Sequence, residues 1–359
     1  MNNGNSQPKK SNPKLQETLG ALLLLLTAII WGLAFVAQSK GMESVGPFTF
    51  NGVRSFVGAI VLIPVLAINR HKIFKVYEEK KTGSNTGADS EKDRTETAAK
   101  PDGNETVAKP DGNETPAMTE ITDPKKRLTV LLTGLLSIGL VFFMASQSQQ
   151  IGIGLTDSVG KAGFITALYI VLVPVAGIFM KKRPNFIVYL CVAASTVGLY
   201  LLCMKKGEGF HLQVGDIFLI ACAVLFTGHI LLIDYFSQRI NGVLIAVTQF
   251  FAVGVLCSIG MIFFEKPTFE QIKSAALPIL YAGALSSGVG YTFQILGQKY
   301  VEPTKASLIM CLESVFSVLG GFLILHQTLS LREGIGCVIM FAAILVCQIF
   351  GQKSFSKGT

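Results

Sequence analysis

Charged residues are scarce in this sequence. They make up 15% of its 359 residues, whereas hydrophobic residues make up 50%; a typical soluble domain is about 25% charged. The shortfall excludes the two soluble domains that the length alone would suggest. The net charge of +8 does not indicate nucleic-acid binding, because the basic residues lie at the ends of apolar runs and not on one soluble face.

Several chemical motifs are also missing. The seven cysteines form no CxxC pair and none lies in a loop beside a histidine, which argues against a disulfide framework or a zinc site. The sequence has no HExxH, no GxSxG with a partner base, no paired aspartates and no GxxxxGK[ST] nucleotide-binding motif. We therefore expect no cofactor, no metal and no enzymatic activity, although an intramembrane enzyme remains the weakest alternative.

What the sequence does have is a series of long apolar runs. A helix needs about 20 mostly apolar residues to cross the hydrocarbon core of a bilayer, and windows of that length recur throughout the chain. We predict an all-α membrane protein with ten transmembrane helices, at residues 18–38, 46–69, 128–150, 156–180, 185–204, 215–234, 242–264, 275–298, 304–326 and 331–351.

Residues 70–127 differ from the rest of the chain. They contain 12 basic and 12 acidic residues, and AKPDGNETV (99–107) is followed directly by AKPDGNETP (108–116). Such a segment has too little apolar surface to offset the entropy of ordering it. We predict a disordered cytoplasmic loop between the second and third helices.

Lys and Arg are unevenly distributed between the two sides. With the N-terminus inside, 23 of the 31 basic residues fall in inside segments and 6 in outside segments. Cytoplasmic loops are usually the basic ones. We therefore predict a multi-pass protein of the plasma membrane with two cytoplasmic tails, residues 1–17 and 352–359.

The two halves of the chain resemble each other. A shift of 195 residues, followed by one of 144 after the polar loop, brings similar residues into register: Gly20 with Gly215, Trp31 with Phe226, Arg54 with Gln249, Phe56 with Phe251, Gln150 with Gln294, Lys161 with Lys305 and Leu168 with Leu312. This register predicts two five-helix repeats, residues 18–204 and 205–351. Because five is odd, the second repeat must enter the membrane from the opposite face, as in many secondary transporters.

Five segments carry a resemblance to a known family. They are TAIIWGLAFVAQ (27–38), Pro47 with Arg54, GKAGFITALYIVLVPV (160–175), GDIFLIACAVLFTGHILLID (215–234) and KASLIMCLESVFSVLGGFLIL (305–325). In this order the chain resembles the EamA-type proteins of the drug/metabolite transporter superfamily. It departs from them at Glu313-Ser314, where the family often has Glu-Pro, and in lacking an acidic residue near residues 180–184 and 325–330. The resemblance implies transport of metabolites, amino acids or drugs.

Two ionisable residues lie deep within predicted spans, where charge is costly and usually serves a cavity or a partner. Glu313 lies about 13 Å along the ninth span; it is a candidate for binding a cationic group or exchanging a proton, or else a buried carboxyl that joins two helices. Arg54 lies about 12 Å along the second span; it could orient an anionic group, or else reach a helix-end carbonyl. Either residue would then belong to a substrate site between the repeats.

The remaining candidates are weaker. Lys161 and Lys305 could lie at the two mouths of the substrate pathway, but a role as anchors that snorkel to the membrane surface is favoured. His229 is favoured as a packing residue. Gly283, Ser287, Tyr291 and Gln294 form a stripe at helical spacing, which close packing of small residues explains as well as a cavity does. Packing is an equal alternative for the other polar and aromatic candidates. These candidates are Gln150, Gln249, Trp31 and Tyr169, the last with Pro174 at a polar kink.

The sequence thus predicts a secondary transporter of a small molecule that works by alternating access within a lipid bilayer. The alternative is a non-transporting sensor or scaffold that uses residues 70–127 to contact a partner. A homodimer is also left open.

Inverted repeats predict that Lys182 and Lys206 face opposite compartments. Single cysteines introduced at the two positions should react with a membrane-impermeant maleimide from opposite sides of the membrane in intact cells and inverted vesicles. Labelling of both cysteines from one side would rule out the inverted architecture.

Overall fold

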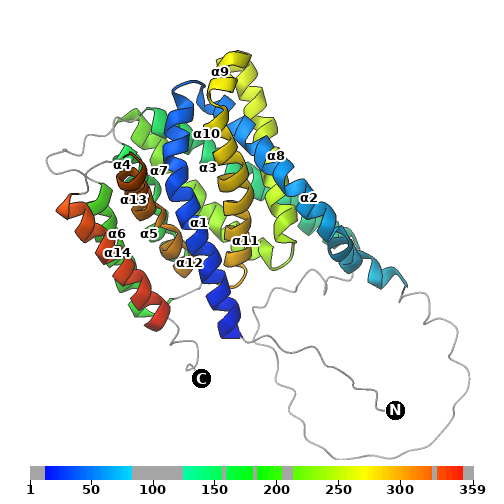
Figure 1. The fold of residues 1–359 in the computed structure, drawn as a ribbon. Coiled ribbons are helices and arrows are strands. Elements are labelled where there is room, and N and C mark those ends of the chain that lie inside the picture. The colour runs from blue at the N-terminus through cyan, green and yellow to red at the C-terminus, as the bar shows by residue number, and fades with distance from the viewer. Residues whose placement is uncertain are drawn as a thin grey trace, which may run out of the picture.

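Every regular element in the described part of the chain is a helix. The computed structural model describes residues 13–82, 124–155, 159–180, 184–203, 213–325 and 330–350. The helices pack side by side into one bundle (Figure 1). In the order of the chain they are α1 (Pro13–Met42), α2 (Pro47–Thr82), α3 (Pro124–Gly154), α4 (Val159–Thr166), α5 (Tyr169–Phe179), α6 (Phe186–Cys203), α7 (Val214–Ser237), α8 (Gly242–Gly260), η1 (Met261–Glu265), α9 (Phe269–Ser274), α10 (Ala276–Leu280), η2 (Tyr281–Gly290), α11 (Tyr291–Gln298), α12 (Pro303–Met310), α13 (Glu313–Leu325) and α14 (Leu331–Phe350).

Each predicted span coincides with one helix or with a consecutive set of helices. Six of the predicted spans each correspond to one helix: α1, α2, α3, α6, α7 and α14. The other four are composite: α4 with α5, α8 with η1, α10 with η2 and α11, and α12 with α13. The short α9, which begins with a capping box between Thr268 and Gln271, was not predicted.

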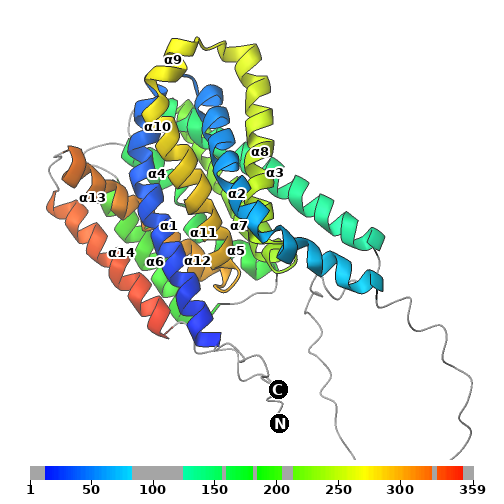
Figure 2. The ribbon, with the colours of Figure 1, turned by 45° about the vertical axis from the view of Figure 1, so that its right-hand side comes forward.

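The polar segment predicted as a loop is partly helical. Helix α2 continues to Thr82 and α3 begins at Pro124, so the two helices extend beyond the bundle at the same end (Figure 2). The prediction of a loop over the whole of 70–127 is therefore wrong at both margins. Residues 83–123, including the tandem repeat, lie outside the described residues, as do Lys182 and Lys206.

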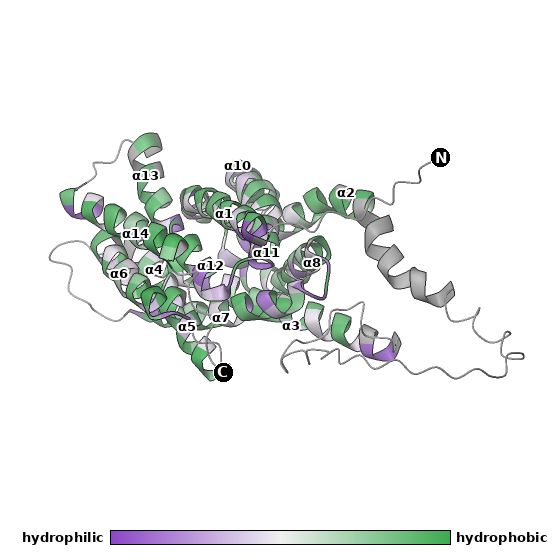
Figure 3. Cartoon of the chain, turned by 90° about the horizontal axis from the view of Figure 1, so that it is seen from below, coloured by the Kyte–Doolittle hydropathy of each residue, from purple (hydrophilic) through white to green (hydrophobic). Residues whose placement is uncertain are grey.

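Much of the outer surface of the bundle is apolar. Large side chains such as Leu136, Phe179 and Phe264 are 71–84% exposed, and apolar residues cover most of the outer helix faces (Figure 3). Patches of this kind rarely face water. In the described part of the chain, six helical segments are long and apolar enough to cross a membrane by length and composition: Lys14–Met42, Pro47–Ile68, Leu128–Gly154, Ala162–Phe179, Val214–Ser237 and Gly242–Glu265.

The main partners of the helices in the first half belong to the second half. Helix α2 packs on α8, α3 on α7, α6 on α14, and α1 on α11, η2 and α13. The first turn of α1 and the last turn of α14 lie at the same end of the bundle, and α9 lies at the opposite end (Figures 1 and 2). The two halves therefore share one interior and are not separate lobes.

The α6–α14 contact depends on two glycines. A Cβ atom on Gly336 would lie 2.6 Å from the carbonyl oxygen of Gly198, and a Cβ on Gly198 would lie 2.9 Å from that of Gly336. Small residues let membrane helices approach this closely, so that dispersion contacts can hold them together. By contrast, a Cβ on Gly334, two residues earlier in α14, would meet nothing within 4 Å.

We expect Gly336→Ala to destabilise the protein by about 1–3 kcal/mol, because the new methyl group forces two backbones apart. Gly334→Ala is the matched control and should be neutral or slightly stabilising, since alanine favours a helix. Thermal unfolding of the purified variants in detergent measures both effects. Equal melting temperatures for the two variants would contradict the close approach.

Candidate functional site

Two helices are interrupted at matching positions in the two halves. Between α4 and α5 the chain tightens at Leu168, whose N–H donates to the Ile165 carbonyl at 3.2 Å. Between α12 and α13 the N–H of Leu312 donates to the Ile309 carbonyl, also at 3.2 Å. Both bonds span three residues, as in a 3₁₀ turn, and the two turns lie 144 residues apart, in the register of the internal duplication.

The first residue after each interruption points at its counterpart. The Tyr169 hydroxyl donates to Oε1 of Glu313 across 3.2 Å, and both side chains are buried. Tyr169 begins α5 and Glu313 begins α13. The two interrupted helices therefore meet through the residues that the repeat relates to each other.

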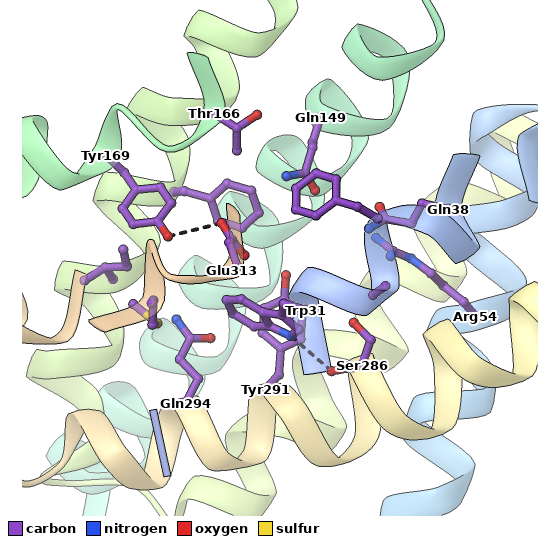
Figure 4. A pocket seen from close by; sticks show the side chains of 15 residues that line it. Trp31, Gln38, Arg54, Gln149, Thr166, Tyr169, Ser286, Tyr291, Gln294 and Glu313 are labelled. Atoms are coloured by element: carbon purple, nitrogen blue, oxygen red, sulfur yellow. Dashed lines mark hydrogen bonds between the residues drawn. The ribbon is translucent and has the colours of Figure 1, made fainter. Parts of the chain in front are cut away.

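A pocket lies beside this contact (Figure 4). Its free volume is about 40 Å³, enough for roughly three waters. Both halves of the chain contribute to its wall. The lining residues are Trp31, Ala34, Phe35, Gln38, Arg54, Gln149, Thr166 and Tyr169 from the first half, and Phe226, Ile230, Ser286, Tyr291, Gln294, Met310 and Glu313 from the second.

An aromatic pair forms one wall of the pocket. The rings of Trp31 and Tyr291 lie 4.4 Å apart between centroids, and the Trp31 indole N–H donates to the Ser286 carbonyl at 3.4 Å. The next residue, Gly32, lets α1 reach the start of α13: a Cβ there would lie 2.6 Å from the Glu313 carbonyl oxygen. The close crossing places the indole and the Glu313 side chain in one cavity.

Arg54 enters the pocket from α2 and is held in place by a buried polar network. Its Nε donates to Oδ1 of Asn51 at 2.9 Å. The Asn51 amide in turn donates to Oγ of Ser146 at 3.2 Å and to Oε1 of Gln147 at 3.1 Å. Because all four side chains are buried, the network joins α2 to α3 and fixes the direction in which the guanidinium group points.

Six of the residues singled out in the sequence line this pocket: Glu313, Arg54, Trp31, Tyr291, Gln294 and Tyr169. Whether they bind a substrate remains a prediction. The other residues are placed elsewhere, as far as the structure describes them.

Two candidates are sequence neighbours of residues that line the pocket. Gln150 donates from its amide to the sulfur of Met42 at 2.6 Å, while its neighbour Gln149 lines the pocket. Ser287 packs against Gly58, where a Cβ would lie 2.7 Å from that of the serine, while Ser286 lines the pocket.

Three further candidates lie outside the wall. His229 and Gln249 are 3.1 Å apart from Nε2 to Oε1 and pair with each other. Lys305 forms a 2.9 Å ion pair with Glu17 at the start of α1. The Lys161 side chain lies outside the described residues.

Sequence reasoning missed Gln38, Gln149, Thr166 and Ser286. One cause is the π-helical geometry of η2, in which the Tyr291 N–H donates to Ser286 five residues earlier. The wider turn shifts the side chains from the α-helical register, so Ser286 lines the pocket where the register predicted Ser287, while Tyr291 and Gln294 line it as predicted. No sequence signal marked Gln38 as a pocket residue, because a single polar residue near a helix end is common.

The profile of the EamA-like transporter family matches residues 18–82 and 213–348 of this chain. The chain belongs to the EamA-like transporter family. It is therefore a multi-pass membrane protein with a transporter's role, and the matched segments fall in both halves, as internal repeats require.

Two curated relatives match almost the whole chain. An uncharacterized transporter of Archaeoglobus fulgidus is 24% identical over 332 residues, covering 91% of this chain and 84% of the relative. The uncharacterized transporter YoaV of Bacillus subtilis is 21% identical over 335 residues, covering 91% and 94%. A protein of known crystal structure is similar in fold: its TM-score is 0.68 at 15% identity, over 93% of this chain and 98% of that one.

The Asn51 network gives a stability prediction. Asn51→Leu removes the acceptor of Arg54 and two donors at once, and buried groups left unpaired cost about 1–3 kcal/mol. Ser146→Ala leaves only one buried donor of Asn51 unpaired and should therefore destabilise the protein less than Asn51→Leu does. Thermal unfolding of both variants tests the difference. If Asn51→Leu were the more stable of the two, the network would not hold α2 to α3.

Proposed function

We propose that this transporter carries a small metabolite, an amino acid, related metabolite or drug-like compound, across the plasma membrane by alternating access at the pocket around Glu313. One observation carries the proposal. The pocket is walled by both halves of the chain at the point where two interrupted helices meet. In transporters built from repeats, substrates bind at such interfaces, beside discontinuous helices.

The proposed architecture has ten spans in two inverted five-helix repeats, with both termini cytoplasmic. Residues related by the repeat lie together, as they would near a two-fold axis: Tyr169 touches Glu313, and the Phe56 and Phe251 rings are 6.2 Å apart between centroids. Trp31 and its counterpart Phe226 both line the pocket. The start of α1 and the end of α14 share one end of the bundle (Figure 1), which is consistent with an even number of crossings.

A polar contact between the halves lies at each end of the bundle. At the end where α1 begins, Lys305 pairs with Glu17. At the end near α9, the Glu265 carboxylate accepts hydrogen bonds at 2.7 Å from the N–H groups of Phe48 and Thr49. With both contacts made, the pocket between them is small, as its 40 Å³ of free space indicates.

Alternating access then consists of opening one polar contact while the other holds. Each contact joins the two halves, so its separation opens a path from the pocket to one side only. Since the sequence has no nucleotide-binding motif, we propose that an ion gradient or substrate exchange drives the cycle.

Proteoliposomes containing the purified protein test this function. We expect at least one compound in a panel of labelled amino acids, organic acids, amines, sugars and nucleosides to show protein-dependent flux. Glu313→Gln should reduce that flux at least about tenfold, because it removes the ionisable carboxyl group from the pocket wall. The control, Glu43→Gln, changes an exposed residue paired with Lys40 and should leave flux unchanged. Absence of flux across the whole panel would count against transport, and equal flux in the two variants would count against this pocket as the route.

A further inference from the structure

Two ionisable side chains of opposite type line the pocket. Arg54 comes from α2 and Glu313 from the start of α13, and they are only 5% and 6% exposed. In Figure 4 the Arg54 side chain lies on one side of the Trp31–Tyr291 pair, near Gln38, whereas Glu313 lies on the other side, with Tyr169. The pocket thus has a basic end and an acidic end.

Neither side chain forms an ion pair with another residue in the described part of the chain. Among the residues that the structure describes, no carboxylate lies within 4.0 Å of the Arg54 guanidinium and no basic nitrogen lies within 4.0 Å of the Glu313 carboxyl. Their hydrogen-bond partners are the uncharged side chains of Asn51 and Tyr169. Isolated buried charges are costly and are usually kept for a partner.

The acidic end also has an acceptor without a donor. Gln294 is 2% exposed, and its Oε1 has no hydrogen-bond partner in the described part of the protein. It lies on the Glu313 side of the pocket (Figure 4). An ammonium group has three donors and no acceptor, so it would satisfy the carboxylate and this amide oxygen together.

We propose that the pocket binds a small zwitterion, with its ammonium group at Glu313 and Gln294 and its carboxylate at Arg54. This inference rests on the proposed function only in identifying the pocket as the substrate site. A guanidinium binds a carboxylate through two parallel hydrogen bonds. A ligand with a single charge pairs with one end and leaves the ionisable group at the other end without a partner, so the pocket selects for a ligand that carries both charges.

The protein contains its own reporter of binding. Trp31 is the single tryptophan of the sequence and lies in the pocket wall. Its fluorescence therefore reports on this site alone, without any transport measurement.

The test titrates the detergent-purified full-length protein with two matched sets of compounds and records Trp31 fluorescence. One set is L-leucine with its amine analogue, 3-methylbutylamine, and its acid analogue, 4-methylpentanoate. The other is 5-aminopentanoate with pentylamine and pentanoate. Loss of one charge-assisted contact should weaken binding at least about tenfold. We expect at least one zwitterion to bind at least tenfold more tightly than both of its analogues. If neither does, the proposal is wrong.

Charge-neutralising variants assign the two ends. Glu313→Gln should bring the zwitterion's affinity to within about threefold of its acid analogue, and Arg54→Gln should bring it to within about threefold of its amine analogue. Glu43→Gln and Lys40→Gln neutralise an exposed pair and should retain the full preference. Should Arg54→Gln fail to fold, Arg54→Lys keeps the positive charge, and we expect it to keep the preference over the amine. Undiminished preference in Glu313→Gln would overturn the assignment.

Binding and transport are read separately. Zwitterion-selective quenching without flux of any compound would support the binding site and refute the transport cycle. Flux of a compound that carries one charge or none, without selective quenching by a zwitterion, would do the reverse.

Discussion

A helix inside a lipid bilayer can be interrupted only where the protein itself satisfies or shields the backbone groups that are released. Lipid offers no hydrogen bonds, so non-helical backbone at that depth occurs only where protein or an internal cavity surrounds it. The turns at Leu168 and Leu312 obey this constraint: both lie between helices, and the residues that follow them are buried. The pocket occurs where these two interruptions face each other.

The same constraint explains why the halves pack into each other so closely. Each interrupted helix needs neighbours on several sides, and these are supplied by the opposite half, since α12 and α13 pack on α1 while α5 packs on α7. Gly32 permits the close crossing of α1 and α13. The polar centre is thereby enclosed by helices whose exposed side chains are largely apolar.

Much of the fold could be predicted from the sequence, because long apolar runs and the positions of charged residues report directly on burial in lipid. The register of 144 residues aligns Leu168 with Leu312, and the structure has equivalent turns at these two residues, which the sequence did not predict. The site was harder to predict. Which face of a helix meets a pocket depends on a rotation of about 100° per residue, so Gln150 and Ser287 were singled out where Gln149 and Ser286 line the wall.

Other features could not be read from residue types at all. The π-helical turn of η2 depends on how α1 and α2 pack against it, and nothing in YAGALSSGVG distinguishes it from an ordinary helix. Similarly, the pairing of His229 with Gln249 and of Lys305 with Glu17 joins residues 20 and 288 positions apart. Contacts between distant segments are set by the tertiary fold.

The Glu265 carboxylate has a consequence for the order of assembly. It caps the amino end of α2, whose first N–H groups would otherwise lack partners. A ribosome makes α2 more than 200 residues before it reaches the residue that completes it. Until the second half is in place, the first N–H groups of α2 must therefore donate to water or to lipid headgroup oxygens. The first half of the chain therefore gains the cap of α2 only after residue 265 has been synthesised.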